Sequence, residues 1–121
     1  MKENFINYDL AVKLKDKGFR EHVRGHYKSK CHLSICSEPI NCNGSASGDI
    51  SAPQIHEVLK WLREKKNLHV AIELSDRNTY CWCIQFVDRR ISRISSHFNN
   101  YFDNWEETAL GAIRYALFNL I

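Results

Sequence analysis

The chain has 121 residues, of which 44% are hydrophobic and 26% are charged, so it is long enough for one two-layer core and too short for two independent ones. Its formal net charge of +3 is well below the dense basic patches that neutralise nucleic-acid phosphates, which disfavours a nucleic-acid partner. No stretch is apolar and long enough to indicate a signal peptide or a membrane span, so we expect a cytoplasmic protein.

A helix from Asn7 to Lys17 is the first predicted element. The Asn7 side chain can accept a hydrogen bond from a free N–H of the first turn, and apolar residues recur behind it at the helical spacing. Gly18 is then expected to end the helix in a left-handed conformation. Phe19 is placed to touch Leu14 across that stop.

Two strands are expected between His22 and Ile35, because the residues there are β-compatible and alternate weakly. Residues 28–30 can turn the chain back between them. The following segment, residues 38–49, concentrates Pro, Gly, Asn and Ser, which favour turns over packed elements. We therefore expect a hairpin followed by a mobile surface loop.

The stretch from Ser51 to Lys66 predicts an amphipathic helix. Ser51 can cap its first turn, and Pro53 suits that turn because it has no N–H to leave unpaired. Trp61 is expected to cover an edge of the core or, if it is exposed, to mark a partner surface. The apolar stripe of the helix consists of Ile55, Val58, Leu59 and Leu62.

A second hairpin is predicted from residues 68–74 and 79–87, with a tight connection at residues 76–78. Alternation places on one face Leu68, Val70, Ile72, Leu74, Trp82, Ile84 and Phe86. The opposite face is expected to be open, and its small thiols and alanine are less polar than a wetted face should be. We expect a partner there, most simply a second copy of the chain forming a homodimer. The candidate interface residues are His69, Glu73, Cys81, Cys83 and Gln85.

The last helix is expected to begin at Asp103 or Asn104 and to run to the final residue. Its expected inner face consists of Trp105, Ala109, Ala112, Ile113, Ala116, Leu117 and Leu120. The resulting order, α-β-β-α-β-β-α, indicates a single α+β domain over residues 1–121. We expect a two-layer sandwich, in which one antiparallel sheet carries about three helices on one face.

The five cysteines are an odd number without a secretion signal, which predicts reduced thiols in place of a disulfide framework. Thiolate and imidazole groups are the ligands of structural zinc, so a zinc site was weighed. The spacing opposes it, because no CxxC pair is present and alternation along a strand would scatter the side chains. We expect no metal and no other cofactor. The residues weighed are His22, His26, Cys31, His32, Cys36 and Cys42.

A nucleophilic thiol is also weighed in the second hairpin, where Cys81 or Cys83 could meet His69. The sequence has no oxyanion loop, nucleophile elbow, phosphate-cradling glycine loop or paired carboxylates. We therefore expect that the protein is not an enzyme.

Basic and aromatic residues gather between the second hairpin and the last helix. Arginine forks clamp phosphates and aromatic rings stack on bases, so this composition could hold a nucleotide or a nucleic-acid end. A solvated connection is the plain alternative. The candidate ligand-binding residues are Arg89, Arg90, Arg93, His97 and Tyr101.

Several segments form a joint pattern: Gly18–Phe19, a strand ending at Tyr27, the ISAP and HEVLKWLREKK motifs of residues 50–66, a tryptophan-containing strand, and the final WEETALGAIRYALFNLI. Together they resemble a family of small orphan proteins encoded by phages and other mobile elements of gut bacteria. The cysteine-rich middle, residues 31–48, departs from the pattern. The resemblance implies a non-enzymatic binding module that engages a host protein. The alternatives are a protein that sequesters a nucleotide or signalling molecule, and a weak nucleic-acid binder.

Overall fold

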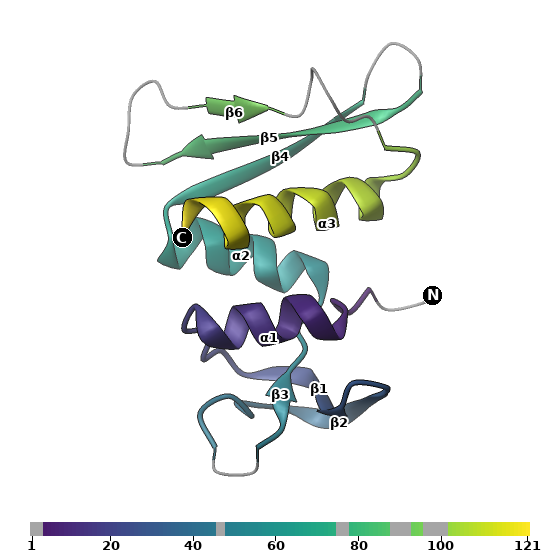
Figure 1. Cartoon of the computed structure of the whole chain (residues 1–121), viewed down its shortest axis with the longest axis vertical. Coiled ribbons are helices and arrows are strands. Elements are labelled where there is room, and N and C mark those ends of the chain that lie inside the picture. Colours follow the sequence, from purple (N-terminus) through teal and green to yellow (C-terminus); the bar gives the residue numbers. More distant parts are fainter. Residues whose placement is uncertain (1–3, 46–47, 75–77, 88–92, 96–101) are drawn as a thin grey trace. The chain divides into compact units, whose positions relative to one another are not determined.

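The computed structural model of the chain describes residues 4–45, 48–74, 78–87, 93–95 and 102–121. It divides into two compact units, Met1–Ile55 and His56–Ile121, and each unit is described by itself. The expected α+β class is confirmed, and the two short strands β3 and β6 extend the expected order of elements (Figure 1). The single domain expected from the length stays a prediction.

Among the described residues, the strands form two three-stranded antiparallel sheets, one in each unit, and the expectation of one continuous sheet is wrong. Alternation along a sequence identifies strands and the faces they share. It does not determine which strands pair across a long connection, and here each hairpin recruits a short strand from its own unit.

Helix α1 spans Tyr8–Asp16 and confirms the predicted first helix. The Asn7 side chain caps it by accepting a first-turn N–H at 3.0 Å. Gly18 has a φ of 93°, and the N–H of Phe19 donates to the Leu14 carbonyl at 3.0 Å, so the predicted left-handed stop is also confirmed. The inward side of α1 is buried at Leu10, Ala11 and Leu14.

The predicted first hairpin is confirmed as strands β1, Val23–Ser29, and β2, His32–Ile40. Lys30 and Cys31 form the turn between them. Strand β2 runs well beyond the expected end of the hairpin. Glu38 and Pro39 belong to this strand and not to a loop.

A bulge in β2 explains why its second half does not look like a strand in the sequence. Gly25 of β1 pairs with Ile35, whereas Val23, two residues away, pairs with Ile40. The four residues 36–39 therefore face the single residue Arg24, so β2 carries three extra residues there. A bulge on an edge strand tolerates a proline.

The segment expected to be a mobile surface loop, residues 38–49, begins with the last residues of β2 and is buried in part. Its mobility stays a prediction. Cys42 and Asn43 are only 5% and 7% exposed. Polar turn-forming residues are compatible with burial when their hydrogen bonds are satisfied within the protein, as those of Asn43 are here.

The second helix, α2, spans Ile55–Lys65 and begins later than expected. Ser51 is not its cap, because it lies in strand β3, Ile50–Ser51, which pairs with β1. A residue near the N-terminus satisfies one N–H of the first turn instead, since the Ile55 N–H donates to the Asn4 carbonyl at 2.8 Å. Trp61 is 4% exposed, so it belongs to the core and does not mark an open surface.

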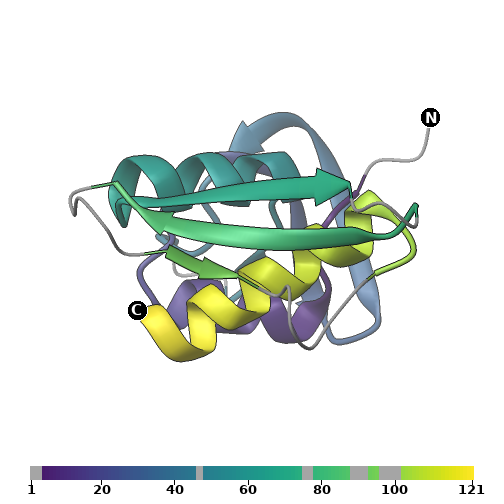
Figure 2. The same ribbon diagram turned by 90° about the horizontal axis from the view of Figure 1, so that it is seen from above.

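The second sheet consists of β4, Leu68–Leu74, β5, Tyr80–Phe86, and β6, Arg93–Ser95. Figure 2 shows β5 between the other two strands. The register of β4 and β5 confirms both predicted faces, because directly opposed residues share a face.

Helix α3, Trp105–Tyr115, continues into a π-helical turn, Ala116–Leu120, and Asn104 caps it as expected. It covers the apolar face of the second sheet (Figure 2). On that face the rings of Trp82 and Tyr115 lie 5.1 Å apart. The predicted inner face is buried at Ala109, Ala112, Ile113, Ala116 and Leu117. Leu120 is half-buried, and Trp105, in the first turn of the helix, is 38% exposed. Within the described residues, no helix has the length and apolar character needed to cross a membrane.

Candidate functional site

The predicted ligand-binding cluster cannot be assembled from the described residues. Arg89, Arg90, His97 and Tyr101 lie outside them. Arg93 is the first residue of β6 and pairs with Gln85 of β5. This pairing gives the position of the Arg93 backbone and says nothing of its side chain. The nucleotide-binding alternative therefore stays a prediction.

The register brings the five predicted interface residues onto one face of the second sheet, but this face is not open at its centre. Cys81 and Cys83 are only 1% and 3% exposed, whereas His69 and Gln85 are exposed. The burial of Cys81 and Cys83 means that these two thiols are not on an open face, so they do not support the expected interface. The homodimer stays a prediction without that support.

The register places His69 and the two thiols on one face but not directly opposite one another. His69 lies opposite Gln85, and Cys83, its diagonal neighbour, lies opposite Ala71, so a meeting of His69 with a thiol stays a prediction. Cys81 lies opposite Glu73, and burial, followed by the charges of Glu73 and Cys83, raises the pKa of the Cys81 thiol. A raised pKa keeps the thiol protonated, which is the opposite of what a nucleophile requires.

The residues weighed as zinc ligands do not come together as one set. Cys31 and His32 lie at the tip of the first hairpin, where His32 Nδ1 is 2.8 Å from the Ser29 hydroxyl. In the part of the chain that the structure describes, no group of three or more His, Cys, Asp and Glu side chains is arranged to hold a metal ion.

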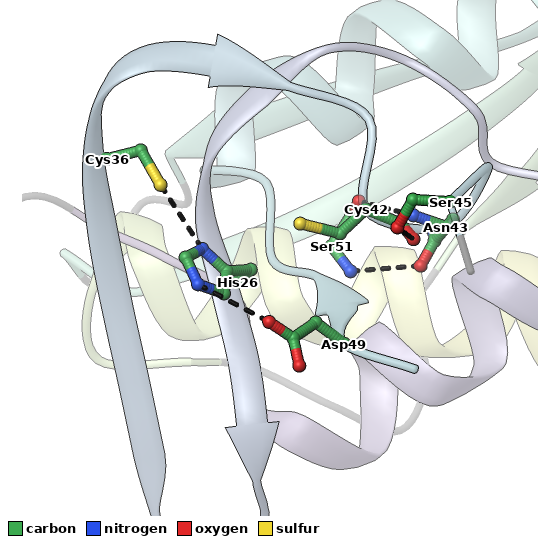
Figure 3. A network of polar contacts seen from close by, with 7 residues as sticks. All are labelled: His26, Cys36, Cys42, Asn43, Ser45, Asp49 and Ser51. Atoms are coloured by element: carbon green, nitrogen blue, oxygen red, sulfur yellow. Dashed lines mark hydrogen bonds and ion pairs between the residues drawn. The ribbon is translucent and has the colours of Figure 1, made fainter. Parts of the chain in front are cut away.

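Two of those residues meet a carboxylate in the first unit, in an arrangement that the sequence did not predict. Figure 3 shows the His26 ring between Cys36 and Asp49. Cys36 Sγ is 3.6 Å from His26 Nδ1, which is within the range of a sulfur hydrogen bond. His26 Nε2 is 3.7 Å from Asp49 Oδ2, an electrostatic contact longer than a direct hydrogen bond. We call these three side chains the Cys36 cluster.

Three different segments position the Cys36 cluster. His26 lies in the middle of β1 and is 6% exposed, Cys36 is the first residue of the β2 bulge, and Asp49 directly precedes β3. His26 pairs with Ser34, and alternation along β2 places Cys36, two residues further on, on the same face of the sheet. Arg24, also on β1, donates from Nε to the Cys36 carbonyl at 3.0 Å and so places a cation beside the bulge.

Asn43 and Ser51 join the segment that precedes β3 to the rest of the unit (Figure 3). The Asn43 side chain accepts from the Ser51 N–H at 2.9 Å, and the Asn43 N–H donates to the Ser51 hydroxyl at 3.2 Å. Asn43 Nδ2 also donates to the Phe19 carbonyl at 3.0 Å. These buried bonds fix both ends of the segment that carries Asp49.

Cys42 lies next to this cluster but has a different chemical character. It is buried, and its pKa is raised by burial first and then by the charges of Asp49 and Cys36. Cys36, by contrast, is half-buried and faces an imidazole. Of these two thiols, the geometry favours Cys36 for chemistry.

The outer strand of the first sheet is a second feature of interest. Strand β2 lies at the edge of the order β2-β1-β3, and all of its residues except Ser34 and Cys36 are exposed. Leu33 and Ile35 are 40% and 49% exposed although both are large and apolar. Because side chains alternate along a strand, these two share one face. We call residues 32–35 the β2 edge.

Known proteins offer no further guide to either feature, since no protein-family model, no curated protein and no solved structure was found to match this chain.

Proposed function

We propose that the protein is a non-enzymatic binding module that engages a host protein by pairing its β2 edge with an extended segment of that partner. The observation that carries the proposal is the exposed edge strand with its two exposed apolar side chains. An edge strand offers free N–H and C=O groups, and a partner strand can pair with them.

Most of the features that protect an edge strand from pairing lie outside the β2 edge. Proteins block such edges with bulges, prolines and charged side chains. In β2 the bulge at residues 36–39, Pro39 and Glu38 all lie beyond residue 35, and a second irregularity of the register lies at residues 32 and 33. The partner strand is therefore expected to align with residues 32–35, where Leu33 and Ile35 would enter its side-chain contacts.

The charges of β2 favour a polypeptide over a nucleic acid. The strand contains one Glu and no Lys or Arg, so it offers no cations to neutralise phosphates. The resemblance to proteins of phages and other mobile elements suggests that the polypeptide belongs to the host.

The proposal is tested by capture from a host lysate with paired variants. Ile35→Lys and Leu33→Lys place a charge on the β2 edge, and Val12→Lys is the matched control, since Val12 is 40% exposed on α1 of the same unit. We expect the wild type and Val12→Lys to retain the same partner and the two β2 variants to lose it. Equal retention by all four proteins, or no specific partner for the wild type, would contradict the proposal.

A further inference from the structure

We propose that Cys36 is a reactive thiol that exchanges with low-molecular-weight disulfides, with His26 as the base that accepts its proton and Asp49 as the positioning residue for the imidazole. This inference is independent of the proposed strand addition, because it depends on the side chains of the Cys36 cluster and not on the free edge of β2.

The geometry assigns a separate role to each nitrogen of His26. The carboxylate of Asp49 faces Nε2, which favours the tautomer with its proton on that nitrogen. Nδ1 is then an acceptor, and it points toward Cys36 Sγ at 3.6 Å. The ring is 6% exposed, so water competes little for either nitrogen. The order thiol, imidazole, carboxylate is the one in which an imidazole activates a nucleophile.

The groups around the Cys36 cluster bring charges of both signs. Arg24 contributes a cation through its bond to the Cys36 carbonyl, and a nearby cation favours a thiolate. Asp49 contributes a negative charge on the far side of the ring. The neighbouring Cys42 has a raised pKa, so it stays a protonated thiol and does not compete for the reagent.

The exchange needs no oxidant other than the disulfide itself. His26 Nδ1 accepts the proton of the Cys36 thiol, and the thiolate attacks one sulfur of the disulfide R–S–S–R. The S–S bond of the reagent breaks as the bond between Cys36 Sγ and that sulfur forms. The leaving thiolate takes the proton from the imidazolium and departs as R–SH. Cys36 is oxidised to a mixed disulfide, and the reagent is reduced to one thiol.

Disulfide exchange also suits the exposure of Cys36. The reaction requires a thiolate, a proton acceptor and an accessible sulfur, without a separate pocket for a developing oxyanion. Cys36 is half-buried in a bulge of a mostly exposed strand, and we expect a small reagent to reach its sulfur.

The test compares the alkylation of Cys36 with that of Cys31 in the same molecule, by iodoacetamide labelling and peptide mass spectrometry. Cys31 is exposed at the tip of the same hairpin and serves as the internal reference. At pH 7 we expect Cys36 to react about 10-fold faster than Cys31, a conservative figure for general-base assistance. Glutathione disulfide should form its mixed disulfide at Cys36. An equal or slower rate for Cys36 would overturn the proposal.

Two variants separate base assistance from a merely structural effect. His26→Gln should reduce the alkylation rate of Cys36 at pH 7 to about that of Cys31. Asp49→Asn should reduce this rate less, because Asp49 is half-exposed and only positions the imidazole. Neither should change the Cys31 rate. Near pH 10, where thiols ionise without a base, the rates of wild type and variants should converge at about the same value. A difference from wild type that persists there would assign the effect to altered structure and overturn the role of His26.

Discussion

The substitution Asn43→Ala tests the buried hydrogen bonds that hold the segment before β3. It removes the acceptor of the Ser51 N–H and one donor to the Phe19 carbonyl. The Phe19 carbonyl keeps a second donor, because Arg20 Nη1 lies 3.1 Å away. A buried N–H without its partner costs about 1–3 kcal/mol, and a partly satisfied carbonyl costs roughly 1 kcal/mol, so the free energy of unfolding should fall by about 2–4 kcal/mol.

Urea unfolding followed by far-UV circular dichroism measures this loss. With a slope of about 1.5 kcal/mol per molar urea, the midpoint should fall by roughly 2 M. Asn41→Ala is the matched control, since Asn41 makes one exposed bond, to the Gly44 N–H, and should lower the midpoint by less than about 0.5 M. All three tryptophans, Trp61, Trp82 and Trp105, lie in the second unit, so their fluorescence reports whether that unit unfolds with the first. Equal midpoint shifts for the two variants would refute the reasoning.

Two further predictions concern stability. Gly25→Ala should lower the free energy of unfolding by about 1–3 kcal/mol in the same urea assay. The added Cβ would meet the Ala52 carbonyl oxygen and, at 2.7 Å, the Phe5 ring. A midpoint equal to that of the wild type would contradict this, because it would mean that the sheet can shift there. Cys81, whose pKa is raised from 9.0, contributes stability that is present below about pH 9 and lost as pH rises through its folded pKa. Cys81→Ala should therefore make the alkaline fall of the unfolding midpoint shallower, measured in reductant between about pH 8 and 11, and an unchanged slope would contradict the raised pKa.

Much of the fold could be predicted because its signals are local. The cap at Asn7, the stop at Gly18 and the alternation in β4 and β5 each depend on a few neighbouring residues. The start of α2 could not be predicted from Ser51, because Ser51 pairs with His26 of β1 and hydrogen-bonds to Asn43. The residues next to Ser51 in the sequence indicate neither partner, since both lie at least eight residues away.

The candidate site depended even more on pairing between segments. His26 and Cys36 were both weighed as metal ligands, so the chemistry of each residue was visible in the sequence. Their meeting requires the register of the first hairpin, in which His26 pairs with Ser34, and weak alternation could not define that register. Asp49 was assigned to a mobile loop, and nothing in its immediate neighbours indicated a histidine partner.

Hydrogen exchange of the complex tests the central claim most directly. The wild-type protein is compared with and without the partner it captures, and amide protection is followed by mass spectrometry. Strand addition predicts that protection appears at residues 32–35, with α1 unchanged, because amides on the free edge become hydrogen-bonded to the partner. Protection confined to other elements, with no change along the β2 edge, would contradict it.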